Sequence, residues 1–181
     1  MALPQEKIYT IDDIYNLPEG KRAELIDGQI YYMSAPNTAH QRILSQLHFS
    51  IMSYIKSNKG GCEVFPAPFA VFLNKDDTNY VEPDISVVCS NNKLDDKGCK
   101  GAPDWIIEIT SPSNAEHDYI IKLYKYQSAG VREYWIVDPK DQTITVYFFE
   151  SKIFAQHYTF IDKIKVNIYD DLYIDFQEIS V

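Results

Sequence analysis

Apolar residues change their spacing several times along the chain, and each change predicts a different element. Thr10 and Asp13 are typical of a helix start, and Pro18 ends that short helix after less than three turns. Residues 23–33 contain two β-rich runs on either side of Asp27-Gly28, a two-residue turn that favours a β-hairpin. The predicted order is therefore a short lead-in helix and then a hairpin.

A helical period of three to four residues begins at Thr38. The apolar residues of 44–55 follow this spacing, and Thr38 and Gln41 can form a capping box, so we predict an amphipathic helix that ends before Gly60. His40 lies near the start of the apolar stripe. Polar residues at helix starts usually make local hydrogen bonds, so His40 is interpreted as a structural histidine.

The middle of the chain is rich in β-forming residues. Prolines and turn-forming residues separate three runs, which predict successive strands at residues 62–65, 69–73 and 80–88. The polar stretch 90–101 is expected to be an exposed loop. Residues 105–109 are almost continuously apolar, as strands covered on both faces tend to be, so this strand is predicted to lie centrally in the sheet.

The segment after the central strand predicts a β-α-β unit. Ser113 and Glu116 can form a capping box, the helical pattern continues to Ala129 and stops at Gly130, and residues 134–137 return to a strand. Such a unit implies a parallel strand pair with a right-handed crossover. Further strands are expected at residues 143–149, 153–158 and 172–176. Together these elements predict a single α/β domain over residues 1–181, with a mixed sheet flanked by helices, an N-terminal hairpin and additional C-terminal strands.

Composition excludes some classes of protein. The 181 residues are 45% hydrophobic and 24% charged, with a mean hydropathy of -0.28, which is too apolar for a disordered chain and too polar for a membrane protein. No apolar run approaches the roughly 18 residues that span a bilayer. The first residues also lack the layout of a signal peptide, so we expect a cytoplasmic protein that does not bind membranes.

The cysteine count bears on disulfide and zinc sites, and the net charge bears on the kind of substrate. Cys62, Cys89 and Cys99 make an odd count without a C-x-x-C pair, which predicts free, partly buried thiols. The net charge of -9 argues against a broad basic surface for nucleic acid. A carboxylate-rich metal site is itself acidic, so the charge weakens the case for DNA as substrate more than the case for a metal site.

Two acids interrupt strands that otherwise have the pattern of a core. Asp84 shares a strand face with Ser86, and Glu108 occupies the middle of an apolar strand, where a carboxylate is costly unless it is paired, protonated or bound to a cation. If the two strands are neighbours, both acids can share one Mg²⁺, a cation that prefers oxygen ligands. The alternative is that each carboxylate caps a strand end or pairs with a lysine.

Lys122 lies on the helix that follows the Glu108 strand. One interpretation is a solvent-facing pair with Asp118 four positions earlier, which stabilises a helix by only about 0.3–0.5 kcal/mol. The other is a cationic side chain that reaches back to the metal site, orients the attacking water and stabilises the charge developing on a phosphorus centre.

Four segments resemble hallmark segments of the Uma family of restriction-endonuclease-like proteins, a branch of the PD-(D/E)XK nuclease superfamily. The resemblance extends over nearly the full length and is carried by residues 23–28, 83–86, 108–113 and 130–138. It implies a restriction-endonuclease-like fold and a Mg²⁺ (or Mn²⁺) site formed by Asp84 and Glu108, with Glu24 entering from the N-terminal hairpin.

The catalytic lysine departs from the superfamily pattern. That lysine normally lies two residues after the second acid, where this chain has Thr110. The resemblance therefore implies a lysine from the following helix, where Lys122 is the matching position and Lys125, one turn away, is the alternative. Residues 116–118 also lack the basic residues often seen there, which implies weak local phosphate binding.

The expected activity is metal-assisted hydrolysis of phosphodiester bonds, with nucleic acid, DNA in the first place, as substrate. The catalytic residues are expected to be Glu24, Asp84, Glu108 and Lys122. An alternative function is a binding or assembly module that keeps the nuclease fold and its acids without turnover. The fourteen tyrosines, frequent in the C-terminal strands, suit an amphipathic contact surface and predict a homodimer.

Overall fold

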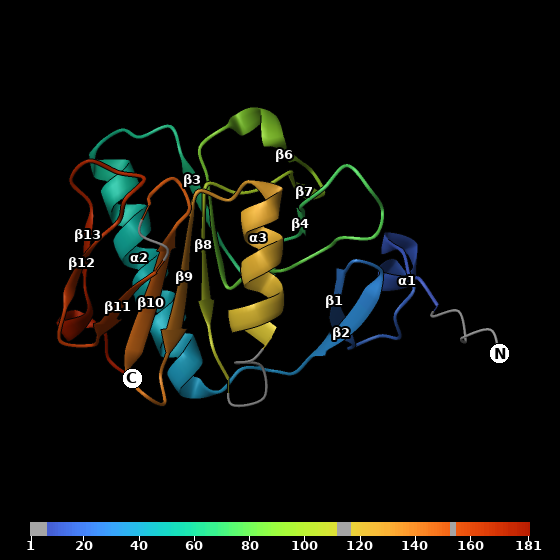
Figure 1. The fold of residues 1–181 in the computed structure, drawn as a ribbon, viewed down its shortest axis with the longest axis horizontal. Helices are drawn as coiled ribbons and strands as arrows, with labels where there is room; N and C mark the ends of the chain where they lie inside the picture. The colour runs from blue at the N-terminus through green and yellow to red at the C-terminus, as the bar shows by residue number, and fades with distance from the viewer. Residues whose placement is uncertain (1–6, 112–116, 153–154) are drawn as a thin grey trace.

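A six-stranded mixed sheet organises the computed structural model, which describes residues 7–111, 117–152 and 155–181 (Figure 1). In spatial order its strands are β11 (Gln156–Thr159), β10 (Thr143–Phe148), β9 (Glu133–Asp138), β8 (Trp105–Ile109), β5 (Ile85–Val88) and β3 (Glu63–Pro66). Strands β8 and β9 are parallel, and the other neighbours are antiparallel. All five residues of β8 are buried, which confirms its central position.

Different helices cover the two faces of this sheet (Figure 1). Helix α2 (Thr38–Ser57) packs on one face together with the C-terminal hairpin of β12 (Lys163–Lys165) and β13 (Tyr173–Asp175). The other face carries α3 (Leu123–Ala129) and a small sheet of β4 (Val71–Phe72), β7 (Gly98–Lys100) and β6 (Leu94–Asp95). No helix in the part of the chain that the structure describes has the length and apolarity needed to cross a membrane.

Alternation along β8 decides which side chains meet which helix. Trp105, Ile107 and Ile109 belong to the core on the α2 face, whereas Ile106 belongs to the core on the α3 face. Glu108 shares the parity of Ile106, because side chains of a strand point alternately to its two faces. A carboxylate is therefore placed beneath the helix that follows β8.

The N-terminal elements agree with the prediction. Helix α1 (Ile11–Tyr15) starts with the expected capping box of Thr10 and Asp13, and β1 (Arg22–Ile26) and β2 (Gln29–Met33) form the expected hairpin. The turn residues have positive φ, 49° at Asp27 and 76° at Gly28. A side chain at position 28 would also approach Ile8 to 2.6 Å, so this turn requires glycine.

The β-α-β unit is confirmed by the parallel pair β8 and β9, and α3 ends as predicted before Gly130, whose φ is 95°. Helix α3 does not start as expected, since the π-helix η2 (His117–Lys122) precedes it directly. The capping box predicted for Ser113 and Glu116 lies outside the described residues.

Several local predictions were wrong. Asn37, and not the pair Thr38 and Gln41, caps α2, because its side chain accepts a hydrogen bond from the His40 backbone at 2.9 Å. The predicted strand at residues 80–88 is shortened to β5, preceded by isolated bridges at Tyr80 and Val81, since Pro83 cannot donate to a ladder.

The prediction of an exposed loop at residues 90–101 was also wrong. It contains the 3₁₀ helix η1 (Asn91–Lys93) and strands β6 and β7, and Cys99 in β7 is fully buried. Its polar residues lie in η1, in the turn at Asp96 and Lys97, and at the exposed positions Asp95 and Lys100 of the two strands. In the C-terminal region β10, β11 and β13 match predicted strands, although residues 153–154 lie outside the described part, and β12 was not foreseen.

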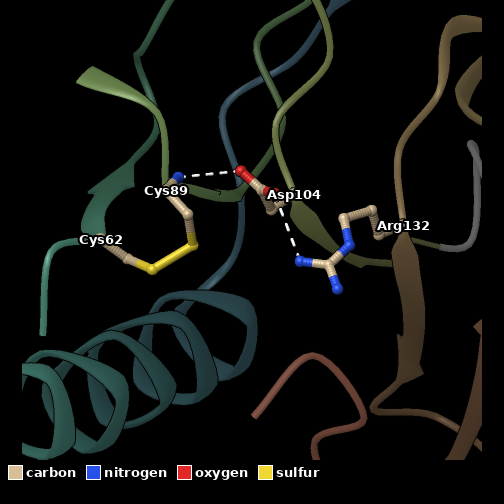
Figure 2. The surroundings of a disulfide bond; sticks show 4 residues. All are labelled: Cys62, Cys89, Asp104 and Arg132. Carbon is tan, nitrogen blue, oxygen red and sulfur yellow. Dashed lines mark hydrogen bonds and ion pairs between the residues drawn. A yellow bond between two sulfur atoms is a disulfide. The ribbon is translucent and has the colours of Figure 1, made fainter.

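Cys62 and Cys89 form a disulfide, which corrects the prediction that all the cysteines are free (Figure 2). The register of β3 and β5 pairs Glu63 with Val88, so the two cysteines lie opposite each other just beyond the paired residues. The Cys89 backbone also donates to Asp104 at 2.8 Å. A disulfide is unusual in a reducing cytoplasm, so it counts against the predicted cytoplasmic location.

We predict that the double substitution Cys62→Ser, Cys89→Ser lowers the free energy of unfolding by about 3 kcal/mol, because the cross-link restricts a loop of 27 residues in the unfolded chain. Denaturant unfolding without reductant measures the loss, and reductant should lower the stability of the wild type while leaving the variant unchanged. Three reactive thiols in the unfolded, unreduced wild type would contradict the prediction.

Candidate active site

A buried lysine joins three carboxylates that come from three different segments. The Nζ atom of Lys122 lies 2.8 Å from Glu108 Oε1, 2.9 Å from Glu24 Oε2 and 3.6 Å from Asp118 Oδ1. Glu24 is on β1, Glu108 on β8, and the other two are on the π-helix. All four residues are at most 5% exposed. The structure thus brings together Glu24, Glu108 and Lys122, three of the residues selected from the sequence.

The π-helix explains how Lys122 points into the protein. Its backbone follows an i to i+5 pattern, and such wide turns are frequent at functional sites. Asp118 and Lys122 are both buried, and the Tyr134 hydroxyl of β9 donates to the Asp118 carbonyl at 3.2 Å. The Asp118–Lys122 pair considered from the sequence therefore exists, but it faces the interior and not solvent.

Asp84 lies beside this cluster, immediately before β5. Its Oδ2 accepts a hydrogen bond from the Ile109 backbone at 2.8 Å and lies 3.0 Å from His40 Nε2. The Asp84 backbone nitrogen is 3.4 Å from Glu108 Oε2. The antiparallel pairing of β5 and β8 produces this proximity, because Asp84 directly precedes β5 and Glu108 lies on the neighbouring strand β8.

His40 was interpreted from the sequence as a structural helix-start residue, which missed its contact with Asp84. The side chain is 8% exposed, and its Nδ1 atom is buried without a hydrogen-bond partner among the described residues. The start of α2 carries it onto the strand edge where Asp84 lies. Tyr126 of α3 was missed as well, and its hydroxyl donates to Glu108 Oε1 at 2.6 Å.

The cluster contains more acids than its cation can neutralise. Burial raises the pKa of Glu108, and it raises the pKa of Asp118 to about 6, in each case against the attraction of Lys122. For Lys122 burial alone would lower the pKa. The attraction of Glu108, Glu24 and Asp118 outweighs that effect and raises the pKa, so the ammonium stays charged.

Lys125, the alternative lysine, lies outside the cluster. Its Nζ pairs with Asp27 in the hairpin turn, and Asp27 is largely exposed. Thr110, at the position where the superfamily pattern places the lysine, hydrogen-bonds through its backbone to Val137 at 2.8 Å. Of the two helix lysines, Lys122 is therefore the one that contacts the acids.

A cavity of about 910 Å³ opens onto this cluster and is lined by residues of β1, β2, α2 and the π-helix. Glu24, Asp84, Glu108 and Lys122 all contribute to its wall. Across residues 7–111, 117–152 and 155–181, no three His, Cys, Asp or Glu side chains already surround a common point that could hold a metal ion. The acids are arranged instead around the lysine.

The oxygens that remain available are nevertheless suited to a hard cation. The hydrogen bonds that Asp84 accepts from described residues fall on Oδ2, and those of Glu108 at normal length fall on Oε1. Among the described residues, Oδ1 of Asp84 and Oε2 of Glu108 are therefore the less engaged oxygens of the two carboxylates, and Oε2 lies 3.4 Å from the Asp84 backbone nitrogen. Glu24 differs, because Oε1 accepts from the Glu82 backbone and Oε2 from Lys122. The donor set fits Mg²⁺ or Mn²⁺ at Asp84 and Glu108.

A mixed sheet with flanking helices, one acid on β8, a second acid directly before the neighbouring strand β5, and a lysine at the same cavity are typical of the restriction-endonuclease-like class. The comparisons agree. The chain is similar to the crystal structure of a protein titled "putative nuclease belonging to DUF820" from Anabaena variabilis ATCC 29413, with a TM-score of 0.76, 24% identity, and coverage of 94% of this chain and 96% of the other. No curated protein matches the chain.

The family is shown by a match to the model of Uma2, described as "Putative restriction endonuclease", over residues 11–161. The chain belongs to this family. The resemblance seen in the sequence is thereby confirmed, and the family supports a nuclease activity in general terms.

We predict that Lys122→Met lowers the free energy of unfolding in the presence of a chelator by about 3–5 kcal/mol, because it leaves buried carboxylates without their cation. The matched control is Lys125→Met, which should cost less, since it leaves behind only Asp27, whose exposed carboxylate can be hydrated. Denaturant unfolding of both variants measures the difference, and equal losses would contradict the assignment of Lys122 to the cluster.

Proposed function

We propose that the protein is a metal-dependent nuclease that hydrolyses phosphodiester bonds, with DNA as the principal substrate. The observation that carries the proposal is the meeting of Asp84, Glu108 and Lys122 at one cavity, where the shorter hydrogen bonds from described residues engage only one oxygen of Asp84 and one of Glu108. A structural ion pair alone would need one acid for one lysine. The surplus of acids supports binding of a cation from solution.

Asp84 and Glu108 are the proposed ligands of Mg²⁺ or Mn²⁺. Such an ion lowers the pKa of bound water and polarises the phosphodiester when it is present. Glu24 was expected to be a third ligand. Because both of its oxygens are engaged, we assign it instead to holding Lys122.

Lys122 is the proposed catalytic cation. Its ammonium has three donors and lies within hydrogen-bond distance of Glu24 and Glu108, so its position is defined by buried partners. In this position it would orient the water nucleophile and stabilise negative charge on the phosphorus centre. Tyr126 donates to Glu108 Oε1, so Oε2 is the Glu108 oxygen proposed to bind the cation.

The substitutions Asp84→Asn and Glu108→Gln should each abolish Mn²⁺ binding and Mn²⁺-dependent cleavage while preserving the fold, because each removes one anionic ligand without changing side-chain size. Calorimetric titration with Mn²⁺, and cleavage assays on single-stranded, duplex and branched DNA, measure the two effects. The control is Glu82→Gln, an acid of the same cavity that pairs with Arg22.

Lys122→Met should bind Mn²⁺ and fail to cleave. Unchanged Mn²⁺ affinity in both acid variants would exclude the proposed site. Mn²⁺ binding by the wild type without cleavage of any nucleic acid would favour the alternative function, a binding or assembly module with a nuclease fold. The predicted homodimer and the predicted cytoplasmic location stay predictions.

His40 is a proposed positioning residue, since it contacts Asp84 and no reacting atom. Substitutions of residues that orient metal ligands typically weaken metal affinity 10- to 100-fold. We therefore predict that His40→Ala weakens Mn²⁺ binding by about that factor. His40→Asn, which keeps a donor and tests partial rescue, is the companion variant. A loss of thermal stability in His40→Ala with unchanged Mn²⁺ affinity would show that the histidine is only structural.

A further inference from the structure

An arginine lies beside the acid cluster on the same face of the N-terminal hairpin. Arg22 and Glu24 are two residues apart on β1, and side chains at this spacing point to the same side of a strand. Both residues line the cavity. Glu24 is 3% exposed, whereas the side chain of Arg22 is 43% exposed. The hairpin therefore places a buried acid and a solvent-accessible cation along one wall of the cavity.

The guanidinium of Arg22 has one end without a partner. Its Nε donates to Glu82 Oε2 at 3.0 Å, and its Nη2 contacts the same oxygen. The Glu82 backbone nitrogen donates in turn to Glu24 Oε1 at 3.0 Å, so this arginine lies next to the cluster. Nη1 makes no hydrogen bond or ion pair with the described residues. An arginine carries N–H donors on all three nitrogens in one rigid plane, so this end can still bind an anion in the cavity.

Arg22 is also the cation of this cavity that a ligand can reach. Among the described residues, the arginine and lysine side chains that line the cavity are Arg22 and Lys122. Lys122 is 5% exposed, and its ammonium lies against three carboxylates. His117 lines the cavity as well, but burial lowers the pKa of its ring, which is therefore uncharged at neutral pH. An anionic group that enters beside the acid pair would thus find its positive partner at Arg22.

A nucleic acid strand carries a phosphate at every nucleotide, so a strand whose scissile phosphate lies at Asp84 and Glu108 brings further phosphates to the cavity wall. We propose that Arg22 binds one of these neighbouring phosphates through the free end of its guanidinium and thereby holds the strand over the acid pair. The planar donors of arginine match the oxygens of a phosphate. Such contacts fix the register of a strand and carry no sequence information. The inference rests on the proposed nuclease function and adds its strand-binding residue.

Fluorescence anisotropy with labelled oligonucleotides tests this contact on the full chain. A single DNA strand and a DNA hairpin duplex are titrated in Ca²⁺ over a series of KCl concentrations, and cleavage is followed in Mn²⁺. Arg22→Gln should weaken binding about tenfold, because a hydrogen bond between charged groups is lost. It should also lower the slope of log Kd against log salt by about 0.7 for the single strand and about 0.9 for the duplex. Arg22→Lys should keep the slope, since it keeps the charge.

The matched control is Arg132→Gln. The side chain of Arg132 is 40% exposed and pairs with Asp104 and Glu150, but it does not line the cavity. This variant should keep the affinity and the salt slope of the wild type. In the cleavage assay Arg22→Gln should raise KM and leave kcat nearly unchanged, because a phosphate away from the reacting bond is bound equally in the ground state and the transition state.

The outcomes separate this inference from the proposed function. An unchanged salt slope and an unchanged KM in Arg22→Gln, with Mn²⁺-dependent cleavage by the wild type, would overturn the inference and leave the nuclease activity standing. A lower melting temperature and a lower kcat in both Arg22 variants, with the slope of the wild type, would also overturn it, since the arginine would then only hold the hairpin. Arg22-dependent binding in Ca²⁺ without cleavage in Mn²⁺ would overturn the hydrolytic activity and support the phosphate contact.

Discussion

A single ammonium group among three buried carboxylates is the constraint on which the rest of the site depends. Neither charge type is tolerable there alone, because an unpaired ion loses its hydration on burial. Lys122 and its partners Glu24 and Glu108 therefore have to be placed together. Since these partners come from the hairpin and the central strand, the same contact ties both elements to the helical segment.

This pairing requires a specific orientation in each of the contributing elements. Alternation along β8 turns Glu108 away from the α2 core, and the π-helix turns Asp118 and Lys122 toward Glu108. The hairpin brings Glu24 into reach, and backbone hydrogen bonds of 2.7 and 2.8 Å between Leu25 and Tyr80 fix its position. A shift of one residue in any of these elements would bury an uncompensated charge, so the fold is specified most strictly around its acids.

Many of the correct predictions came from signals that lie within a few neighbouring residues of the sequence. The Asp27-Gly28 turn, the capping box at Thr10 and the stop at Gly130 act through neighbouring residues, and each was found in the structure. Glu108 was also recognisable, because a charge inside an apolar strand has few structural explanations. These features depend only on backbone preference and side-chain period.

Other features depend on partners that are distant in sequence. His40 and Asp84 are separated by 44 residues, and only the packing of α2 against the start of β5 brings them together. The Cys62–Cys89 disulfide likewise follows from the register of β3 and β5, which cysteine spacing does not encode. The choice between Lys122 and Lys125 depended on a π-helix, whose wide turn breaks the period on which helical-face arguments rely.

The acid surplus links the site to the net charge of the whole chain. The net charge of the chain is -9, and Arg22 and Lys122 at the cavity are already paired with acids, so the protein has no broad electrostatic attraction for nucleic acid. Its affinity for a nucleic acid therefore has to come from contacts that a negative surface can still make. In the proposed function such a contact would be a divalent ion shared between a carboxylate of the site and a phosphate of the strand. This contact would act at short range and would require an accessible phosphate at the cavity. An acidic nuclease of this kind would therefore depend on access of the strand to the site and not on long-range attraction.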